Sequence, residues 1–481
     1  MSAGEAIAGG GDPLEPATRV LASPADPADP AALALLEAGL GRVDLAAPAV
    51  VLPDFHHKDD KEMPSSIAVA TRSAVWPLLT APSVNCGMAL VALDVERPPA
   101  DAITDFYTRV RERFPYPPTY RRDLTPEEVV RCAAEGARFA ADRWEVDPAE
   151  LDRIEEGGRL DLERFGGAER VRRELPWSVL QLSRIRFGTI GPSNHFIELQ
   201  QVDEVLEPEV ARLLGVEEGQ VTMQLHGGGG SLPGDVGLLF GPRRRNPRPV
   251  RVQMAIQKPL YHLARARSRA ELRRRLALYF GRDYPPVERD SGEGERLLLA
   301  NAMAMNYGFA FRLYAYASLR ALLRASLGVR EARLVVDSPH NTIYEEELDG
   351  ERVLVHRHNA ARAYPAARMR GHPLFARTGQ PVLLPGTNRT SSYLCVAADG
   401  ADASLYSACH GAGATVKRLV SRGLSGDDPR RRVTLRYGYR EPGPIEVGQL
   451  DDRGVDEALG VLVRAGVLRP VARLRPFAVL N

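Results

Sequence analysis

A thiol and three imidazoles stand in polar or glycine-rich stretches at predicted strand ends, where functional side chains are usually displayed. One thiolate and neutral imidazoles suit a borderline transition metal such as manganese, zinc or iron. Their wide spacing is unlike the tight Cys-x-x-Cys pattern of zinc modules. A second interpretation therefore stays open at this point, with hydrogen-bonded histidines and a small core cysteine. The four residues are Cys86, His195, His226 and His340.

The segment Ser407–Ala414 indicates a second kind of chemistry, because its His410 precedes Gly-Ala-Gly. Glycines beside a histidine let backbone N–H groups approach an oxyanion closely, as phosphate-binding loops require. A neutral histidine can attack phosphorus and hold the product as a phosphoramidate. The pattern is weak by itself, since Gly-x-Gly occurs by chance and such a histidine is often only a turn residue.

The basic residues restrict the possible phosphate chemistry. Of the 63 lysines and arginines only four are lysine, and none of the four follows a glycine. This excludes a phosphate loop of the Gly-Lys-Ser/Thr type, whose lysine must reach the terminal phosphates. None stands in a Lys-x-Asp-Gly arrangement either, so a lysine-based nucleotidyl transferase is also excluded. The four are Lys58, Lys61, Lys258 and Lys417.

The elements that must position these residues are mixed. Two helices are predicted, the longer of them ended by Gly328. Short apolar runs predict strands, one of which follows the hairpin turn Asp349-Gly350. Because strands and helices do not alternate regularly, we expect an α+β fold rather than a doubly wound sheet. The predicted helices are 124–143 and 293–327, and the strands are 334–336, 353–355, 381–384 and 393–396.

The 481 residues carry a net charge of +1 and can bury a large core. Residues 1–30, rich in Ala, Gly and Pro, predict a flexible tail, and residues 31–481 predict a single large mixed domain. No apolar run is long enough to span a membrane and no secretory signal is visible. With only four cysteines and hence no disulfide framework, we expect a cytoplasmic protein.

Several short segments between residues 50 and 481 are collinear with one known family. They include Leu52-Pro53-Asp54-Phe55-His56, Asn85-Cys86-Gly87-Met88, Asn194-His195-Phe196-Ile197-Glu198, His340-Asn341 and Cys409-His410-Gly411-Ala412-Gly413. In this set and order the chain resembles the RtcB family of RNA-splicing ligases, which join an RNA 3′-phosphate or 2′,3′-cyclic phosphate end to a 5′-hydroxyl end. The resemblance implies an RtcB-like catalytic domain over residues 31–481, with central β-sheets flanked by helices.

The resemblance also implies roles for single residues. His410 matches the histidine that the family guanylylates from GTP before GMP passes to the RNA 3′-phosphate. Cys86, His226 and His340 match the ligands of one manganese ion, and Cys86 with His195 matches two of the three ligands of a second. The GTP-contacting positions match Asn194, His195, Phe196, Ile197, Glu198, His340, Asn341, Pro385, Gly386, Thr387, Asn388, Ser392, His410, Gly411, Ala412, Gly413 and, in place of a guanine-reading lysine, Asn481.

The implied partners are GTP and RNA ends, such as tRNA halves or damaged RNA. The sequence is compatible with a helper protein but does not identify one. Three arginine clusters could contact RNA phosphates bidentately, or could simply be solvated faces. They are Arg243–Arg245 with Arg248 and Arg251 in a predicted Pro-rich loop; Arg265, Arg267, Arg269 and Arg273–Arg275 on a predicted helix; and Arg430–Arg432 followed by Arg436, Tyr437 and Tyr439.

Charged groups around the phosphates depart from the family pattern. An expected aspartate is Ser83, which should weaken the second cation site because a hard anionic ligand is lost. Expected arginines are replaced by Gly230 and Ala414, and the polar loop after Pro385 carries an extra Arg389. Two alternatives to full ligation therefore stay open. One is an altered nucleotidyl transferase or RNA end-processing hydrolase, and the other is an RNA-binding relative with little catalysis.

Overall fold

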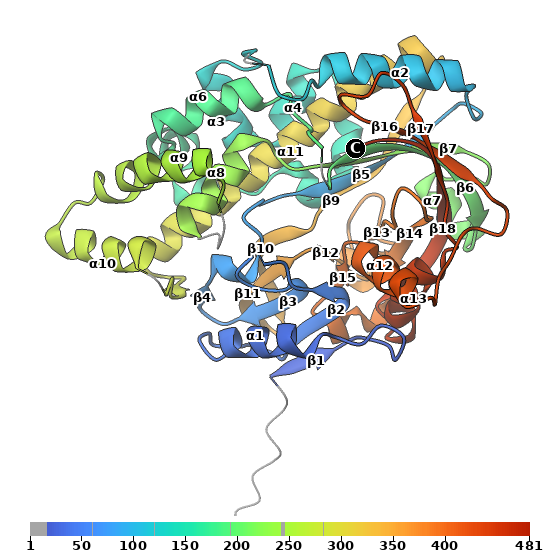
Figure 1. Ribbon diagram of the computed structural model, residues 1–481. Coiled ribbons are helices and arrows are strands. Elements are labelled where there is room, and N and C mark those ends of the chain that lie inside the picture. Colours follow the sequence, from blue (N-terminus) through green and yellow to red (C-terminus); the bar gives the residue numbers. More distant parts are fainter. Residues whose placement is uncertain (1–16, 60, 120, 193, 242–245, 282) are drawn as a thin grey trace, which may run out of the picture.

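Two large sheets and the helices around them form the fold (Figure 1), which the computed structural model describes for residues 17–481 except 60, 120, 193, 242–245 and 282. In this described part, the larger sheet has nine strands in the order β13-β14-β18-β6-β7-β5-β9, with β16 paired to β18 and β17 to β16. The smaller sheet has the order β1-β2-β3-β11-β10. Mixed sheets with separate helices confirm the predicted α+β class.

The strands of the larger sheet are β5 Gly87–Leu93, β6 Phe196–Val205, β7 Val221–Gly227, β9 Ala332–Pro339, β13 Pro381–Leu384, β14 Ser392–Ala397, β16 Val433–Tyr437, β17 Ile445–Gly448 and β18 Leu468–Leu480. Those of the smaller sheet are β1 Thr18–Val20, β2 Ala49–His56, β3 Ser65–Thr71, β10 Asn341–Leu348 and β11 Glu351–His358. Two short pairs are β12 Ala360–Arg362 with β15 Ser407–Cys409, and β4 Ala74–Val75 with β8 Val287–Glu288. All four predicted strand segments lie in strands, and the predicted Asp349-Gly350 turn joins β10 to β11.

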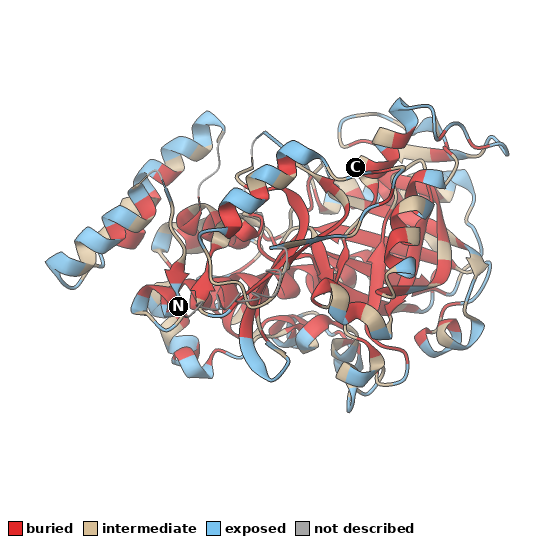
Figure 2. Ribbon diagram, turned by 90° about the horizontal axis from the view of Figure 1, so that it is seen from below, coloured by how far each residue is buried: buried red, intermediate tan, exposed pale blue. Residues whose placement is uncertain are grey.

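The helix α11 Gly292–Leu327 runs through the helical half of the molecule and confirms the longer predicted helix. It begins at Ser291, whose Oγ accepts the N–H of Gly294 at 3.0 Å, and ends at Gly328 in the left-handed conformation (φ 69°). Most of its residues are buried on every side, as expected of a helix inside a core rather than on a surface. Figure 2 shows that the strands are mostly buried, whereas the outer helices expose one face.

The other helices include one break that the sequence pattern did not predict. Residues 124–143 form two helices rather than one, because Gly136 takes a positive φ (60°) and a Cβ there would lie 2.2 Å from the carbonyl oxygen of Gly158. The helices are α1 Pro30–Leu40, α2 Ala100–Arg113, α3 Pro126–Glu135, α4 Ala137–Arg143, α5 Gly167–Glu174, α6 Trp177–Arg186, α7 Pro208–Leu214, α8 Ser231–Phe240, α9 Arg248–Lys258, α10 Arg269–Phe280, α12 Gly413–Ser421 and α13 Arg453–Arg464.

Residues 17–30 were expected to belong to a flexible tail, and the structure corrects this. Strand β1 pairs in parallel with β2, and Asp26 is buried. The carboxylate of Asp26 accepts hydrogen bonds of 2.6 Å from Arg418 and from the hydroxyl of Thr415, both on α12. Backbone pairing with β2, packing of Leu21 against the core and the ion pair of Asp26 together hold this segment on the domain, which a composition rich in Ala and Pro does not reveal. Residues 1–16 of the predicted tail lie outside the described residues.

The structure also changes the placement of the first predicted arginine cluster. Arg248 and Arg251 lie on α9 rather than in a loop, because Pro249 in the first turn suits a helix start. Arg243–Arg245 lie outside the described residues.

Among the described residues, no helix is both long enough and apolar enough to cross a membrane.

Candidate metal and nucleotide site

Three adjacent strands bring three of the predicted ligands to one end of the larger sheet. Cys86 immediately precedes β5, His226 lies at the end of β7, and His340 follows β9. Strand β5 lies between the other two, and Gly87 pairs with both Gly227 and Pro339. The N–H of His340 donates to the carbonyl of Cys86 at 2.9 Å, so the backbone itself couples two of these residues.

The side chains of these residues form one buried group. The Nε2 atom of His226 lies 3.3 Å from the Sγ of Cys86 and 3.1 Å from the Nε2 of His340. One ligand atom from each residue lies within 4.8 Å of the others, and all three residues are buried. A fourth predicted ligand, His195, contributes its Nε2 at 3.5 Å from the same sulfur. The structure therefore brings together all four predicted metal ligands.

Backbone carbonyls fix the orientation of two of these imidazoles. The Nδ1 of His226 lies 2.6 Å from the carbonyl of Asn194, and that of His195 lies 2.8 Å from the carbonyl of Ile190. A carbonyl can only accept, so each Nδ1 carries the proton and each Nε2 keeps a lone pair directed at the thiol group. Lone pairs facing one another at 3.1 Å repel unless a cation or a proton lies between them. The donor set therefore fits a transition metal held by Cys86, His226 and His340.

The sequence interpretation did not identify two neighbours of this group as functional residues. Arg312, with no exposed side-chain surface, donates to Asp337 at 2.7 Å and to the carbonyl of Asn85 at 2.6 Å. It thereby holds the turn that carries Cys86. The available signal was a lone arginine inside the apolar run of α11. The second neighbour is Gly228, where a Cβ would lie 3.1 Å from the His195 ring, closer than most real contacts.

Burial sets the protonation of the group. It raises the pKa of the Cys86 thiol to about 12, and the positive charge of Arg312 offsets this only in part. It also lowers the pKa of His226 and His340 well below 6.5, with additional repulsion from His410. Both imidazoles are therefore neutral at pH 7, which is the form that ligates a metal.

His410 lies directly against this group. Its ring stacks on that of His340 with centroids 3.7 Å apart and planes 10° apart, and the His226 ring centroid is 5.2 Å away. Its N–H donates to the carbonyl of Asn359 at 3.1 Å, which ties it to β12 beside His340. Burial and the charges of Lys58 and His56 lower the pKa of His410 to about 3, so this imidazole is also neutral.

The segment after His410 is fixed from two sides. The N–H of Ala412 donates to the carbonyl of Pro385 at 3.0 Å, which places the predicted Pro385–Asn388 turn against it. The carboxylate of Asp54 accepts the N–H of Thr415 at 2.7 Å in the first turn of α12. Asp54 lies in β2, so the smaller sheet and the nucleotide segment meet here.

Among the other predicted GTP-contacting residues, Phe196 contacts the buried group, and Gly386, Ser392 and Glu198 are linked to one another through hydrogen bonds. Phe196 packs edge-on against the His226 ring at 5.4 Å between centroids. Ser392 Oγ accepts the N–H of Gly386 at 3.3 Å, and Gln200 Nε2 donates both to this oxygen and to Glu198. Burial raises the pKa of the Glu198 carboxyl to about 8.

Asn481, the last residue, lies beside the start of β6. Leu480 pairs with Ile197, which places Asn481 next to Phe196 across the sheet. Its side-chain Oδ1 is buried without a hydrogen-bond partner among the described residues. The chain end is therefore brought to the predicted nucleotide segment, as the alignment of Asn481 with a guanine-reading lysine implies.

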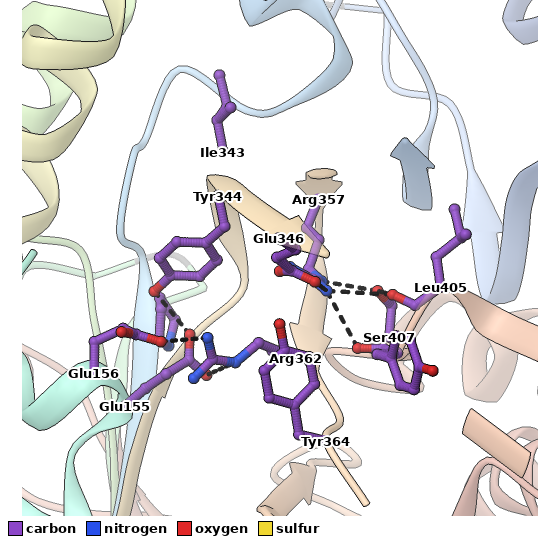
Figure 3. Close-up of polar contacts among 12 residues, drawn as sticks. Glu155, Glu156, Ile343, Tyr344, Glu346, Arg357, Arg362, Tyr364, Leu405 and Ser407 are labelled. Atoms are coloured by element: carbon purple, nitrogen blue, oxygen red, sulfur yellow. Dashed lines mark hydrogen bonds and ion pairs between the residues drawn. The ribbon is translucent and has the colours of Figure 1, made fainter. Parts of the chain in front are cut away.

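A buried ion-pair network supports the strand that leads to His410 (Figure 3). Arg357 on β11 pairs with Glu346 on β10 at 2.5 Å and donates to the hydroxyl of Ser407 at 2.8 Å. Arg362 on β12, which pairs with Ser407, contacts Glu156 at 2.5 Å. The strand β15 is thus attached to β11 through the guanidinium of Arg357 and to β12 through backbone pairing.

Replacing Arg357 with methionine is expected to lower the free energy of unfolding by about 3–5 kcal/mol, because Glu346 would remain buried without its partner. Guanidinium unfolding followed by circular dichroism measures this change. The double variant Arg357→Met/Glu346→Leu should recover part of the loss, since no unpaired charge is then left. A single variant as stable as the wild type would contradict this role of the pair.

Comparison with known proteins agrees with this geometry. The family described as "tRNA-splicing ligase RtcB" matches residues 42–481. The chain is 29% identical to the tRNA-splicing ligase RtcB of Thermococcus kodakarensis over 90% of this chain and 87% of that relative. It is 31% identical to the RNA-splicing ligase RtcB of Mycobacterium bovis over 71% of this chain and 73% of that relative.

The relative from Pyrococcus abyssi, also a tRNA-splicing ligase RtcB, is 31% identical over 72% of this chain. The match covers only 36% of that relative, so the chain spans little more than a third of its length. The family match nevertheless takes in every residue of the buried thiol–imidazole group, His410 and Asn481. The chain therefore belongs to the RtcB family of tRNA-splicing ligases.

Proposed function

We propose that this protein is an RNA ligase that joins a 3′-phosphate or 2′,3′-cyclic phosphate end to a 5′-hydroxyl end, using GTP and manganese. The observation that carries the proposal is the parallel stacking of His410 on His340 at 3.7 Å, since His340 belongs to the buried thiol–imidazole group. A nucleophilic imidazole and a cation site in direct contact suit attack on a phosphorus atom.

His410 is the proposed nucleophile. A lone pair of its neutral imidazole attacks the α-phosphorus of GTP, a P–N bond forms, and the bond to the β-phosphate oxygen breaks to release pyrophosphate. An oxygen of the RNA 3′-phosphate then attacks the same phosphorus, and the P–N bond breaks. Finally the 5′-hydroxyl oxygen attacks the RNA phosphorus, loses its proton, and GMP leaves. A bound manganese ion would supply charge neutralisation at the phosphate oxygens.

The chain's own residues orient the nucleotide in this proposal. Phe196 and Asn481 stand side by side at the start of β6, where a flat base could lie against the Phe196 ring. The Ser392 hydroxyl accepts hydrogen bonds from Gly386 and Gln200 and keeps its own O–H to donate to a phosphate oxygen. Asn481 offers the base an uncharged amide rather than the family's ammonium.

One specific observation favours an altered transferase as a second candidate. The Ser83 hydroxyl accepts a hydrogen bond from Asn341 at 3.3 Å, and the described residues contain one group of three ligands, which has no carboxylate. Both features support one filled cation site and a weakened second site. A single cation suits transfer of the nucleotide to His410 but leaves less charge to stabilise the later steps.

RNA contact is proposed for an arginine-rich cleft between α5, α10 and the start of α11. Arg173, Arg267 and Arg274 line it and are exposed. Four free, buried cysteines also suit a reducing cytoplasm.

The test incubates the wild-type protein with two RNA strands, one ending in a labelled 3′-phosphate and one beginning with a 5′-hydroxyl. With GTP and manganese, a joined product on a denaturing gel is expected. Removal of the phosphate without joining would identify an end-processing hydrolase, and a gel shift without chemistry would identify an RNA-binding relative. Joining with ATP but not GTP would revise the nucleotide.

A further inference from the structure

A row of exposed apolar side chains runs along α9, which projects from the body of the molecule together with α10 (Figure 1). Val252 is 63% exposed, Ile256 59% and Leu260, in the helical turn that continues α9, 55%. Residues four apart lie on one face of a helix, so these three form one continuous row. Single apolar residues are normal on a surface, whereas a contiguous apolar patch is typical of an interaction site.

The opposite face of α9 is attached to its neighbours. Met254 and Gln257 are buried, and Gln257 Nε2 donates to the hydroxyl of Ser178 on α6 at 3.4 Å. Gln253 donates to the carboxylate of Asp235 on α8 at 2.8 Å. These contacts hold α9 in the orientation that directs the apolar row away from the body.

Trp177 adds a large aromatic side chain beside the row. It precedes Ser178, the residue that contacts Gln257, and is 77% exposed, the highest value among the large hydrophobic residues that the structure describes. Tryptophan is enriched among the residues that contribute most of the binding energy in protein interfaces. We call the surface formed by Trp177, Val252, Ile256 and Leu260 the α9 surface.

The charges near the α9 surface are almost all positive. Between residues 248 and 280 the sequence has nine basic side chains and one acidic one, Glu271. The Glu271 carboxylate accepts the N–H of Arg267 at 2.7 Å and pairs with Arg275 at 2.5 Å. Exposed arginines that do not line the proposed RNA cleft are Arg248 and Arg251 on α9, and Arg269 and Arg273 on α10. A binding partner must therefore offer negative charge beside its apolar groups.

Helix α10 repeats the pattern of α9. Its exposed Arg269, Arg273, Leu276 and Phe280 are spaced by four, three and four residues, which places them on one helical face. On both helices, arginines in the first turns are followed by large apolar side chains. This combination fits an amphipathic helix whose acidic side chains flank its apolar face.

Two other occupants fit the α9 surface less well. A second copy of the chain would place the same patch of each copy against the other, and hence arginines against arginines. RNA would pair with the arginines, but Val252, Ile256 and Leu260 are aliphatic and offer no ring on which bases could stack. An acidic amphipathic helix satisfies both the charges and the apolar row.

We propose that the α9 surface binds an acidic amphipathic helix of a partner protein. The apolar face of that helix covers Val252, Ile256 and Leu260 and packs against Trp177, and its carboxylates face the arginines. This inference goes beyond the proposed ligation and does not depend on it.

The test measures binding of three labelled synthetic helical peptides to the full-length protein by fluorescence anisotropy. In the first peptide, leucines at every third or fourth position form one face and glutamates fill the other. The second has the same composition with the leucines distributed around the helix, and the third has lysines in place of the glutamates. The wild type should bind the first peptide at least about tenfold more tightly than the others. Equal affinity for the first and second peptides, or no binding of the first, would overturn the proposal.

Two charge-neutral variants locate the contact. Ile256→Gln and Trp177→Ala change exposed positions, and each should weaken binding of the first peptide about tenfold. The matched control is Leu213→Gln on α7, an exposed apolar residue outside α9 and α10, which should bind like the wild type. A folded Ile256→Gln that keeps the wild-type affinity would contradict the proposal.

The same variant distinguishes the other occupants. Sedimentation should show the same oligomeric state for the wild type and Ile256→Gln, and a dimer that the variant loses would identify a second copy as the occupant. A short single-stranded RNA should bind both proteins equally, and weaker binding to the variant would make RNA the occupant. Ile256→Gln should also take covalent label from GTP like the wild type. A wild type that takes no label would contradict the proposed guanylylation and leave the peptide comparison intact.

Discussion

Replacing His410 with alanine is expected to abolish covalent labelling by GTP and to lower RNA joining by on the order of 10⁴-fold or more, as for other enzymes that lose their nucleophile. The variant is expected to fold. The His410 N–H donates to the Asn359 carbonyl through the backbone, and alanine keeps this bond. The measurement uses α-labelled GTP with manganese and a denaturing gel, which retains only label bound covalently to the protein.

The matched control is His372→Ala. His372 stacks on Phe375 at a ring distance of 4.6 Å and contacts neither the buried thiol–imidazole group nor the predicted nucleotide segments. This variant should take label at the wild-type rate. If His410→Ala still took label, the nucleophile would be another side chain and the stacking on His340 would have only a structural role.

The residue types of the site could be predicted from the sequence, but their convergence could not be derived from spacing. Cys86, His226 and His340 are up to 254 positions apart, and only the order β7-β5-β9 makes them neighbours. Strand order depends on long-range pairing, which apolar periodicity does not encode. The resemblance to a known family supplied this grouping, whereas the residues alone favoured hydrogen-bonded histidines and a core cysteine.

Other features escaped prediction because they depend on a single close contact. Gly136 divides one periodic helix pattern into two helices because the Gly158 carbonyl approaches it, and neither residue signals this locally. The role of Arg312 under the Cys86 turn similarly depends on Asp337, which reaches it from another strand. By contrast, α11 was predicted correctly because its apolar composition and its Gly328 cap are local signals.

The second large effect concerns the metal. Replacing Cys86 with alanine is expected to weaken manganese binding by at least about 100-fold, because it removes one of three ligands and its negative charge. The measurement is the manganese content after equilibrium dialysis, determined by mass spectrometry. The wild type should retain about one ion per chain, because Ser83 replaces the carboxylate expected at a second site.

Cys132→Ala is the matched control for the loss of a buried thiol. Both cysteines are buried and free, but Cys132 lies on α3 in the helical core. The control variant should lose some stability and keep its manganese, which separates ligand loss from general damage to the fold. Manganese should also raise the free energy of unfolding of the wild type, by about 2.7 kcal/mol at 100 times the dissociation constant. That increase should persist in Cys132→Ala and vanish in Cys86→Ala. If Cys86→Ala kept both its metal content and the stabilisation, the cation would be held elsewhere, and the contact between His410 and the thiol–imidazole group would no longer support a metal-assisted reaction.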